Sequence, residues 1–213
     1  MSDSRKAHWE RVYATKAPTE VSWYEPVPAR SLDLIRATGE PLTASILDVG
    51  GGSSTLVDCL LEAGYSDISV LDVAKGALEH ARARLGGAAA RVSWIEADIT
   101  NFQSARPFAI WHDRAVFHFL TEGDDRERYL GVLQRTLRAG GHLVLATFGP
   151  AGPTRCSGLA VQRYSESEVS ALLGSGFALR MYQVEEHRAP RGAVQQFLYG
   201  WWQNERPDTS LTR

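Results

Sequence analysis

The sequence predicts an α/β protein built on a seven-stranded, mostly parallel sheet with helices on both faces. Two observations lead to this prediction. Short apolar runs alternate with segments of helical periodicity over residues 45–173, as in parallel strands joined by crossover helices. The link over residues 187–192 is too short for such a helix, so the last two strands, 178–186 and 194–202, should form an antiparallel hairpin.

The elements follow one another closely along the chain. Two short helices, 4–16 and 28–38, flank an aromatic loop bounded by prolines, so residues 1–42 should form an N-terminal helical cap. The core, residues 45–202, places strands at 45–49, 68–72, 92–96, 108–111 and 142–147, and helices at 54–63, 74–85, 121–138 and 165–173. Capping boxes are expected at Thr121 and Ser165. We expect residues 1–213 to form a single domain.

Composition and charge narrow the classes of function. The formal net charge is −2 over 213 residues, so no excess of positive charge favours nucleic acid or an anionic membrane. Two cysteines, Cys59 and Cys156, are too few for a disulfide framework or a metal cluster, and no metal is expected. No apolar run is long enough to span a bilayer, and no signal peptide is recognised after Lys6. We therefore expect a cytoplasmic protein that binds neither nucleic acid nor membrane.

A glycine-rich turn follows the first strand, in the segment Asp48-Val49-Gly50-Gly51-Gly52. Glycines allow positive φ and leave no Cβ in a ligand's way, and the helix that follows offers free N–H groups. This arrangement typically binds an adenosine-containing ligand at the carboxyl ends of parallel strands. Asp72 lies 20 residues after Gly52 and can accept both ribose hydroxyls. Acids stand at or near four strand ends: Asp48, Asp72, Asp98 and Asp113.

The spacing of the glycines argues against a dinucleotide. In the G-x-G-x-x-G pattern of NAD-binding proteins, the third glycine would fall on Thr55. Here an acid precedes the glycines instead, and the chain offers no second mononucleotide-binding half. An NAD(P)-linked oxidoreductase and a non-catalytic adenosine-binding module remain as alternatives to a transferase.

From about Ile46 onward the chain resembles class I S-adenosylmethionine-dependent methyltransferases. Asp48–Gly52 is similar to the family's first motif, with Ser54 in place of a common last glycine, and Arg138–Leu145 resembles its step from helix through two glycines to the fifth strand. The resemblance implies a Rossmann-like fold and S-adenosyl-L-methionine as cofactor. In this family Asp72 would bind the ribose and Asp98 the adenine amine. The implied cofactor-binding residues are Asp48, Gly50, Gly52, Asp72, Val73, Asp98, Ile99 and Asp113.

The N-terminal aromatic residues sharpen the resemblance. Trp9-x-x-x-Tyr13, followed by Ser22-Trp23-Tyr24, resembles a branch that includes thiol-type small-molecule methyltransferases and elongation-factor lysine methyltransferases. It implies that Trp9, Tyr13 and Trp23 touch the cofactor, whose sulfonium suits aromatic faces. The alternative is that Trp9 and Tyr13 form only the apolar face of an ordinary helix.

The segment from His112 to Leu120, expected to follow the fourth strand, borders both methyl donor and acceptor in such enzymes. It lacks the Asn-Pro-Pro-Tyr type sequence, which speaks against an amide or nucleobase nitrogen as acceptor. Arg114 and His118 are the candidate catalytic residues, for binding an anionic acceptor or taking its proton. For His118 a place in the apolar core is the alternative. We expect a small-molecule acceptor, with a protein lysine as the alternative, and a monomer or homodimer.

Overall fold

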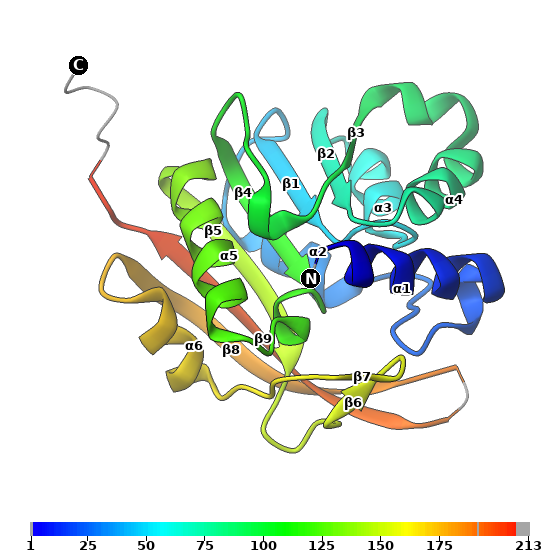
Figure 1. The fold of residues 1–213 in the computed structure, drawn as a ribbon. Helices are drawn as coiled ribbons and strands as arrows, with labels where there is room; N and C mark the ends of the chain where they lie inside the picture. Colours follow the sequence, from blue (N-terminus) through cyan, green and yellow to red (C-terminus); the bar gives the residue numbers. More distant parts are fainter. Residues whose placement is uncertain (1, 191, 208–213) are drawn as a thin grey trace.

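A seven-stranded sheet forms the centre of the computed structural model, which describes residues 2–190 and 192–207. Its strands are β1 (Ser45–Val49), β2 (Asp67–Asp72), β3 (Val92–Glu96), β4 (Phe108–Arg114), β5 (Leu137–Phe148), β8 (Phe177–Arg188) and β9 (Val194–Asn204). Their order is β3-β2-β1-β4-β5-β9-β8 (Figure 1). The first five pair in parallel, and β9 runs antiparallel to β5 and β8. The predicted mixed sheet with its terminal hairpin is confirmed.

Helices cover both faces of this sheet (Figure 1). Neighbouring strand residues point to opposite faces, so Ile46 belongs to one buried cluster and Leu47 to the other. The Ile46 cluster is covered by α2 (Ala29–Ala37), α3 (Leu56–Glu62) and α4 (Lys75–Leu85). The Leu47 cluster is covered by α5 (Gly123–Thr136) and α6 (Glu166–Leu173). Because both faces are covered, the central strands are apolar along most of their length.

The first helix, α1 (Ser2–Thr15), lies outside these two layers and crosses the molecule near the carboxyl ends of the parallel strands (Figure 1). Its residue Glu10 accepts hydrogen bonds from the backbone N–H groups of Lys75 and Gly76, at 2.8 and 3.3 Å. These N–H groups belong to the first turn of α4, which has no capping side chain of its own. Glu10 therefore caps α4 from another helix and ties α1 to the core.

Short elements complete the described chain. The expected loop over residues 149–158 instead contains the first strand of a small hairpin, β6 (Arg155–Cys156) and β7 (Leu159–Ala160). Four short 3₁₀ helices are η1 (Pro18–Glu20), η2 (Gly86–Arg91), η3 (Ile99–Asn101) and η4 (Phe117–Phe119).

Three boundaries differ from the sequence prediction. The strand expected to end at Trp111 continues to Arg114, because pairing with β5 extends to that residue. No side-chain cap forms at Thr121, and Glu122 is the residue that precedes α5. The Gly140-Gly141 pair, expected to end a helix, lies inside β5. The capping box at Ser165 is confirmed, since its hydroxyl accepts from the N–H of Glu168 while the Glu168 carboxylate accepts from Ser165.

Candidate active site

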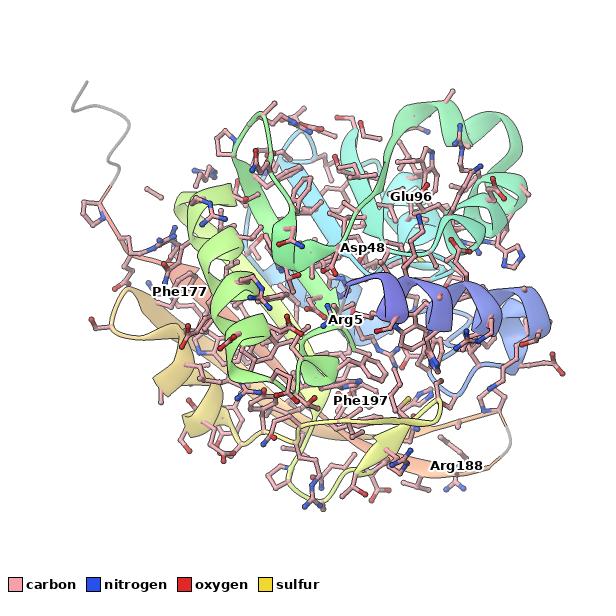
Figure 2. The ribbon with its side chains drawn as sticks, in the orientation of Figure 1. Arg5, Asp48, Glu96, Phe177, Arg188 and Phe197 are labelled. Atoms are coloured by element: carbon pink, nitrogen blue, oxygen red, sulfur yellow. The ribbon has the colours of Figure 1, made fainter. Side chains whose placement is uncertain are left out.

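Two adjoining pockets open where the parallel strands end. The larger, with about 680 Å³ of open space, lies toward β2 and is here called the β2-side pocket; the other, with about 500 Å³, lies at the start of α3 and is called the α3-side pocket. Side chains from α1, from the strand ends and from β9 approach this region, as Arg5, Asp48 and Phe197 show in Figure 2. The two pockets share five lining residues: Tyr13, Trp23, Val49, Gly50 and Arg114.

The turn after β1 needs its glycines because it passes against two buried carboxylates. Gly50 has a φ of +69°, a conformation that favours glycine. A Cβ on Gly51 would lie 2.2 Å from Oδ2 of Asp48, and one on Gly52 would lie 2.3 Å from Oδ2 of Asp72. Gly50 lines both pockets, whereas Gly52 is buried beneath them and lines neither. Gly52 therefore acts by leaving room for Asp72.

Asp72 ends β2 at the floor of the β2-side pocket and is 5% exposed. Its Oδ1 accepts from the N–H of Ala74 at 2.9 Å. Burial raises the pKa of this carboxyl to about 7, and the charge of Asp48 adds to that rise, while backbone donors oppose it. Val73 lines the same pocket. A hydroxyl pair brought to Asp72 would add donors to those that its carboxylate already has from the backbone.

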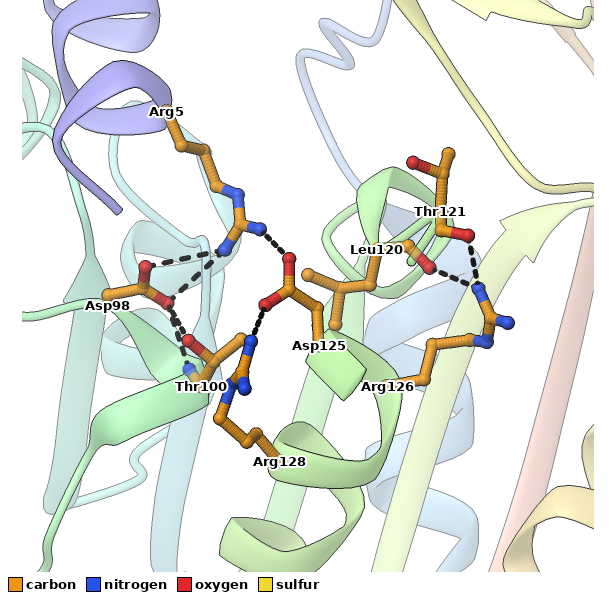
Figure 3. Close-up of polar contacts among 8 residues, drawn as sticks. All are labelled: Arg5, Asp98, Thr100, Leu120, Thr121, Asp125, Arg126 and Arg128. Carbon is orange, nitrogen blue, oxygen red and sulfur yellow. Dashed lines mark hydrogen bonds and ion pairs between the residues drawn. The ribbon is translucent and has the colours of Figure 1, made fainter. Parts of the chain in front are cut away.

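Asp98 and Ile99 follow β3 on the far wall of the β2-side pocket. Asp98 Oδ1 accepts from the N–H and the hydroxyl of Thr100, at 2.9 and 2.8 Å, and Asp98 also pairs with Arg5 at 3.3 Å (Figure 3). Arg5 reaches onward to Asp125 at 2.5 Å, so α1 is fastened to both sides of this wall. The sequence offered no signal for Arg5, which nevertheless lines the pocket. Apolar side chains beside Asp98 suit a flat base: Leu71, Ile99, Val116 and Leu120.

Aromatic side chains from the N-terminal cap cover the junction of the pockets. Trp9 contacts Trp23 and Phe119 edge to face, with ring centroids 5.6 and 5.0 Å apart. Tyr13 is buried, and its pKa is raised by burial and by the charge of Asp72. The structure thus brings the three expected aromatics, Trp9, Tyr13 and Trp23, to the site, where Trp9 and Tyr13 also pack as a helix face. Phe119 joins them from the segment, His112 to Leu120, that was expected to border the site.

Arg114 stands at the junction and lines both pockets. It donates to the hydroxyl of Tyr199 at 2.8 Å, the carbonyl of Trp23 at 2.8 Å and the carboxylate of Glu25 at 2.7 Å. Burial alone would raise the pKa of Glu25, but hydrogen bonds and charge from His187 and Arg114 lower it. The cation is therefore paired and fixed in direction, and it joins the aromatic loop to β9.

His118, one of the two candidate catalytic residues, does not reach the site. Its side chain is fully buried, its Nδ1 accepts from the N–H of Phe148 at 3.2 Å, and its ring stacks on Phe148 with centroids 4.4 Å apart. Burial lowers its pKa to about 3. It lines neither pocket, which corrects the expectation that it stands beside a methyl acceptor.

Asp113, expected to face the cofactor, also lies in the core. It is 0% exposed, and its carboxylate accepts from the N–H of Val116 at 2.8 Å and the hydroxyl of Tyr129 at 2.7 Å. Burial raises its pKa to about 6, although these donors oppose the rise. Because it lines neither pocket, the expected contact is corrected: Asp113 holds the turn that carries Ala115 and Val116 to the pocket wall.

Asp48, at the end of β1, lines the α3-side pocket and is 1% exposed. Its Oδ1 lies 2.7 Å from Nδ1 of His112, whereas its Oδ2 has no hydrogen-bond partner among the described residues. A buried carboxylate oxygen without a partner is costly, so a ligand that donates to it is favoured. An ammonium group would be such a donor.

Comparison with known proteins agrees with this geometry. A structure of the N-methyltransferase NodS from Bradyrhizobium japonicum WM9 in complex with S-adenosylhomocysteine superimposes with a TM-score of 0.73 at 20% identity, covering 94% of this chain and 98% of that one. A family model described as "Methyltransferase domain" matches residues 46–141. Residues 46–141 are therefore similar to a methyltransferase domain, and the fold around them is that of S-adenosylmethionine-dependent methyltransferases. A second structure, the 1,6-didemethyltoxoflavin-N1-methyltransferase of Burkholderia thailandensis with its substrate bound, gives 0.67 at 19% identity, covering 95% and 85%.

Two relatives found by sequence similarity match this chain over only part of their own length. The eEF1A lysine and N-terminal methyltransferase of Mus musculus is 21% identical over 186 residues, 83% of this chain and 24% of that protein. Nodulation protein S of Rhizobium tropici is 29% identical over 113 residues, 53% of this chain and 45% of that protein. The chain therefore spans less than half the length of either relative.

S-adenosylmethionine, the cofactor of this methyltransferase domain, fits the residues present. Asp72 offers a buried acceptor, Asp98 stands beside an apolar slot, and Asp48 has an oxygen without a partner. Within residues 2–190 and 192–207, no cluster of three or more potential metal ligands was found. Over the same residues, no helix is both long and apolar enough to cross a membrane.

Proposed function

We propose that this chain transfers a methyl group from S-adenosylmethionine to a small-molecule acceptor bound beside Trp9, Trp23 and Arg114. The observation that carries the proposal is the position of Arg114, a fixed cation that lines both pockets under an aromatic cover. The toxoflavin and nodulation methyltransferases to which the chain is similar support a small acceptor. No part of the described chain offers a separate substrate domain beside the sheet.

In this proposal the β2-side pocket binds the adenosine group. Asp72 would accept hydrogen bonds from the ribose hydroxyls. Asp98 would accept one from the exocyclic amine of the base, and its ion pair with Arg5 would be partly replaced. The α3-side pocket would bind the methionyl group, with Asp48 accepting from its ammonium. Val73, Ile99 and Gly50 would line the nucleoside, while Gly52 leaves space for Asp72.

The bound sulfonium supplies an activated methyl group, so the protein mainly has to orient the acceptor and exclude water. Positioning of this kind accounts for about 7–11 kcal/mol of a barrier in favourable cases. Among the described residues, the imidazole that lines either pocket is that of His112, in the α3-side pocket, and both its ring nitrogens are already bonded. Of the carboxylates, Asp48, Asp72 and Asp98 are assigned to the cofactor, and Glu25 pairs with Arg114. An acceptor that is nucleophilic without a protein base, such as a thiolate or carboxylate anion, fits this lining, and Arg114 would bind its negative charge.

The proposal is tested by transfer of a labelled methyl group from S-adenosylmethionine to a panel of small thiols, carboxylates and amines, and in parallel to purified elongation factor 1A. We expect label in one class of small anionic acceptor, and none with the Asp72→Ala variant. Label in the protein alone would contradict the proposal and favour a lysine acceptor. Tight binding of S-adenosylhomocysteine without transfer to any acceptor would favour a non-catalytic module.

A protein lysine is the second candidate acceptor, because the similarity to the mouse eEF1A methyltransferase extends over 83% of this chain. A lysine acceptor needs a channel for an extended cationic side chain, which the fixed positive charge of Arg114 disfavours.

We further propose a single domain that acts in the cytoplasm as a monomer or homodimer without nucleic acid or membrane partners. Both cysteines are free, as expected for a reducing compartment.

A further inference from the structure

Asp48 belongs to a buried hydrogen-bonded chain that links the α3-side pocket to α2. His112, on β4, places Nδ1 2.7 Å from Oδ1 of Asp48 and Nε2 2.8 Å from the hydroxyl oxygen of Ser31. The three side chains are 1%, 3% and 1% exposed, in the order Asp48, His112, Ser31. They come from β1, β4 and the first turns of α2, so the chain runs across one face of the sheet.

The order Asp, His, Ser is that of a hydrolytic triad, but burial excludes this use. A nucleophile must reach its substrate, and Ser31 is covered and lines neither pocket. Asp48 and His112 both line the α3-side pocket, but both ring nitrogens of His112 are already bonded, whereas Oδ2 of Asp48 is buried without a partner among the described residues. The chain therefore acts on the pocket through the carboxylate.

We propose that His112 and Ser31 are positioning residues that hold Asp48 with its free oxygen toward the ammonium of the bound methionyl group. A carboxylate at the end of a strand can rotate about χ2, and a donor fixed on Oδ1 removes that freedom. Ser31 fixes the imidazole in turn, because a hydroxyl that donates to Nε2 keeps the proton on Nδ1. The inference rests on the cofactor site and is independent of the proposed acceptor.

Two ligands separate this role from a general effect on folding. S-adenosylhomocysteine occupies both pockets, whereas methylthioadenosine lacks the amino-acid group and reaches only the adenosine site. We expect His112→Leu to weaken S-adenosylhomocysteine binding about tenfold, as for a hydrogen bond to a charged group, and to leave methylthioadenosine affinity unchanged. His112→Asn keeps a donor near the Nδ1 position and should recover most of the lost affinity. Titration calorimetry measures both ligands.

His142→Leu is the matched control. His142 is another buried histidine on a central strand, 5% exposed, but it bonds to Trp201 and lies outside both pockets. Its loss should change neither affinity. Equal weakening of both ligands by His112→Leu, no weakening of either, or failure of His112→Asn to recover affinity would overturn the proposal.

Ser31→Ala provides a milder test that removes one hydroxyl from the first turns of α2. The Ser31→Ala variant still tests the proposal if His112→Leu does not fold. We expect the ratio of the two dissociation constants to shift in the same direction by a smaller factor. An unchanged ratio would contradict the role of Ser31 and, with an unfolded His112→Leu, the proposal itself.

Discussion

The β2-side and α3-side pockets share lining residues, yet they are assembled from different parts of the chain. Asp72 and Asp98, in the β2-side pocket, directly end or follow strands, so their positions come with the sheet. Asp48 and Arg114 also lie at strand ends, but their side chains are held by partners remote in sequence: Asp48 by His112, which bonds to Ser31, and Arg114 by Tyr199. The carboxylates proposed to bind the nucleoside therefore accept from backbone groups close in sequence, whereas the surroundings of Asp48 and Arg114 depend on tertiary packing. The following variants test this difference.

The largest effect is expected at Asp72. Asp72→Ala removes the acceptor of two ribose hydroxyls, and S-adenosylhomocysteine affinity should fall about 100-fold. Asp67→Ala is the matched control, since Asp67 begins the same strand, is partly exposed and pairs with Arg106 at 2.5 Å. Calorimetry on the two variants compares the two ends of β2. Equal affinities would show that the β2-side pocket does not bind the nucleoside.

Arg114→Lys should affect use of the acceptor without affecting binding of the adenosine group. Lysine keeps the charge but cannot bond simultaneously to Tyr199, Trp23 and Glu25. We expect kcat/KM for the acceptor to fall about tenfold, with unchanged affinity for methylthioadenosine. Arg126→Lys, which alters a cation that lines neither pocket, should leave both unchanged. A loss of methylthioadenosine binding in Arg114→Lys would contradict a division between the pockets.

Cofactor affinity should depend on pH through Asp72. Its pKa is raised to about 7 by burial, so below that value the free protein carries the protonated carboxyl. Ribose hydroxyls donate to the ionised form, and binding should therefore weaken as pH falls through 7, by up to about tenfold per unit. Calorimetry between about pH 6 and about pH 8 measures the slope. Asp72→Asn should flatten it, and a slope that persists in this variant would assign the titration to another group.

The smallest effect is expected at the hydrogen bonds that join Glu10 on α1 to the start of α4. Glu10→Ala removes the carboxylate that accepts from Lys75 and Gly76. Because α1 covers the pockets, S-adenosylhomocysteine should dissociate about threefold faster, which stopped-flow fluorescence of the nearby tryptophans can follow. Glu79→Ala, on the exposed side of α4, is the control. Unchanged dissociation in Glu10→Ala would mean that these hydrogen bonds do not govern access.

The sequence predicted the parts of the site that depend on strand order and on the glycine turn. Asp72, Asp98 and Ile99 line the β2-side pocket as expected, because a parallel sheet brings its strand ends together, and their contact with a cofactor stays a prediction. Arg5 was missed because nothing in its neighbourhood indicates a partner more than ninety residues away. His118 was misplaced because periodicity could not show that β4 runs on to Arg114 and turns the following segment inward.

Because β9 follows the other strands in the sequence, the two parts of the site are synthesised at different times. The strand ends and the glycine turn have all been translated by residue 148, so a nascent chain of that length already carries the cofactor residues. Tyr199 accepts a hydrogen bond from Arg114, and the ring of Phe197 lies under its guanidinium. Both residues are synthesised only with β9. Until then the edge of β5 is unpaired and exposed to other strands. β9 thus both completes the surroundings of Arg114 and covers an edge of β5 that could otherwise pair with other chains.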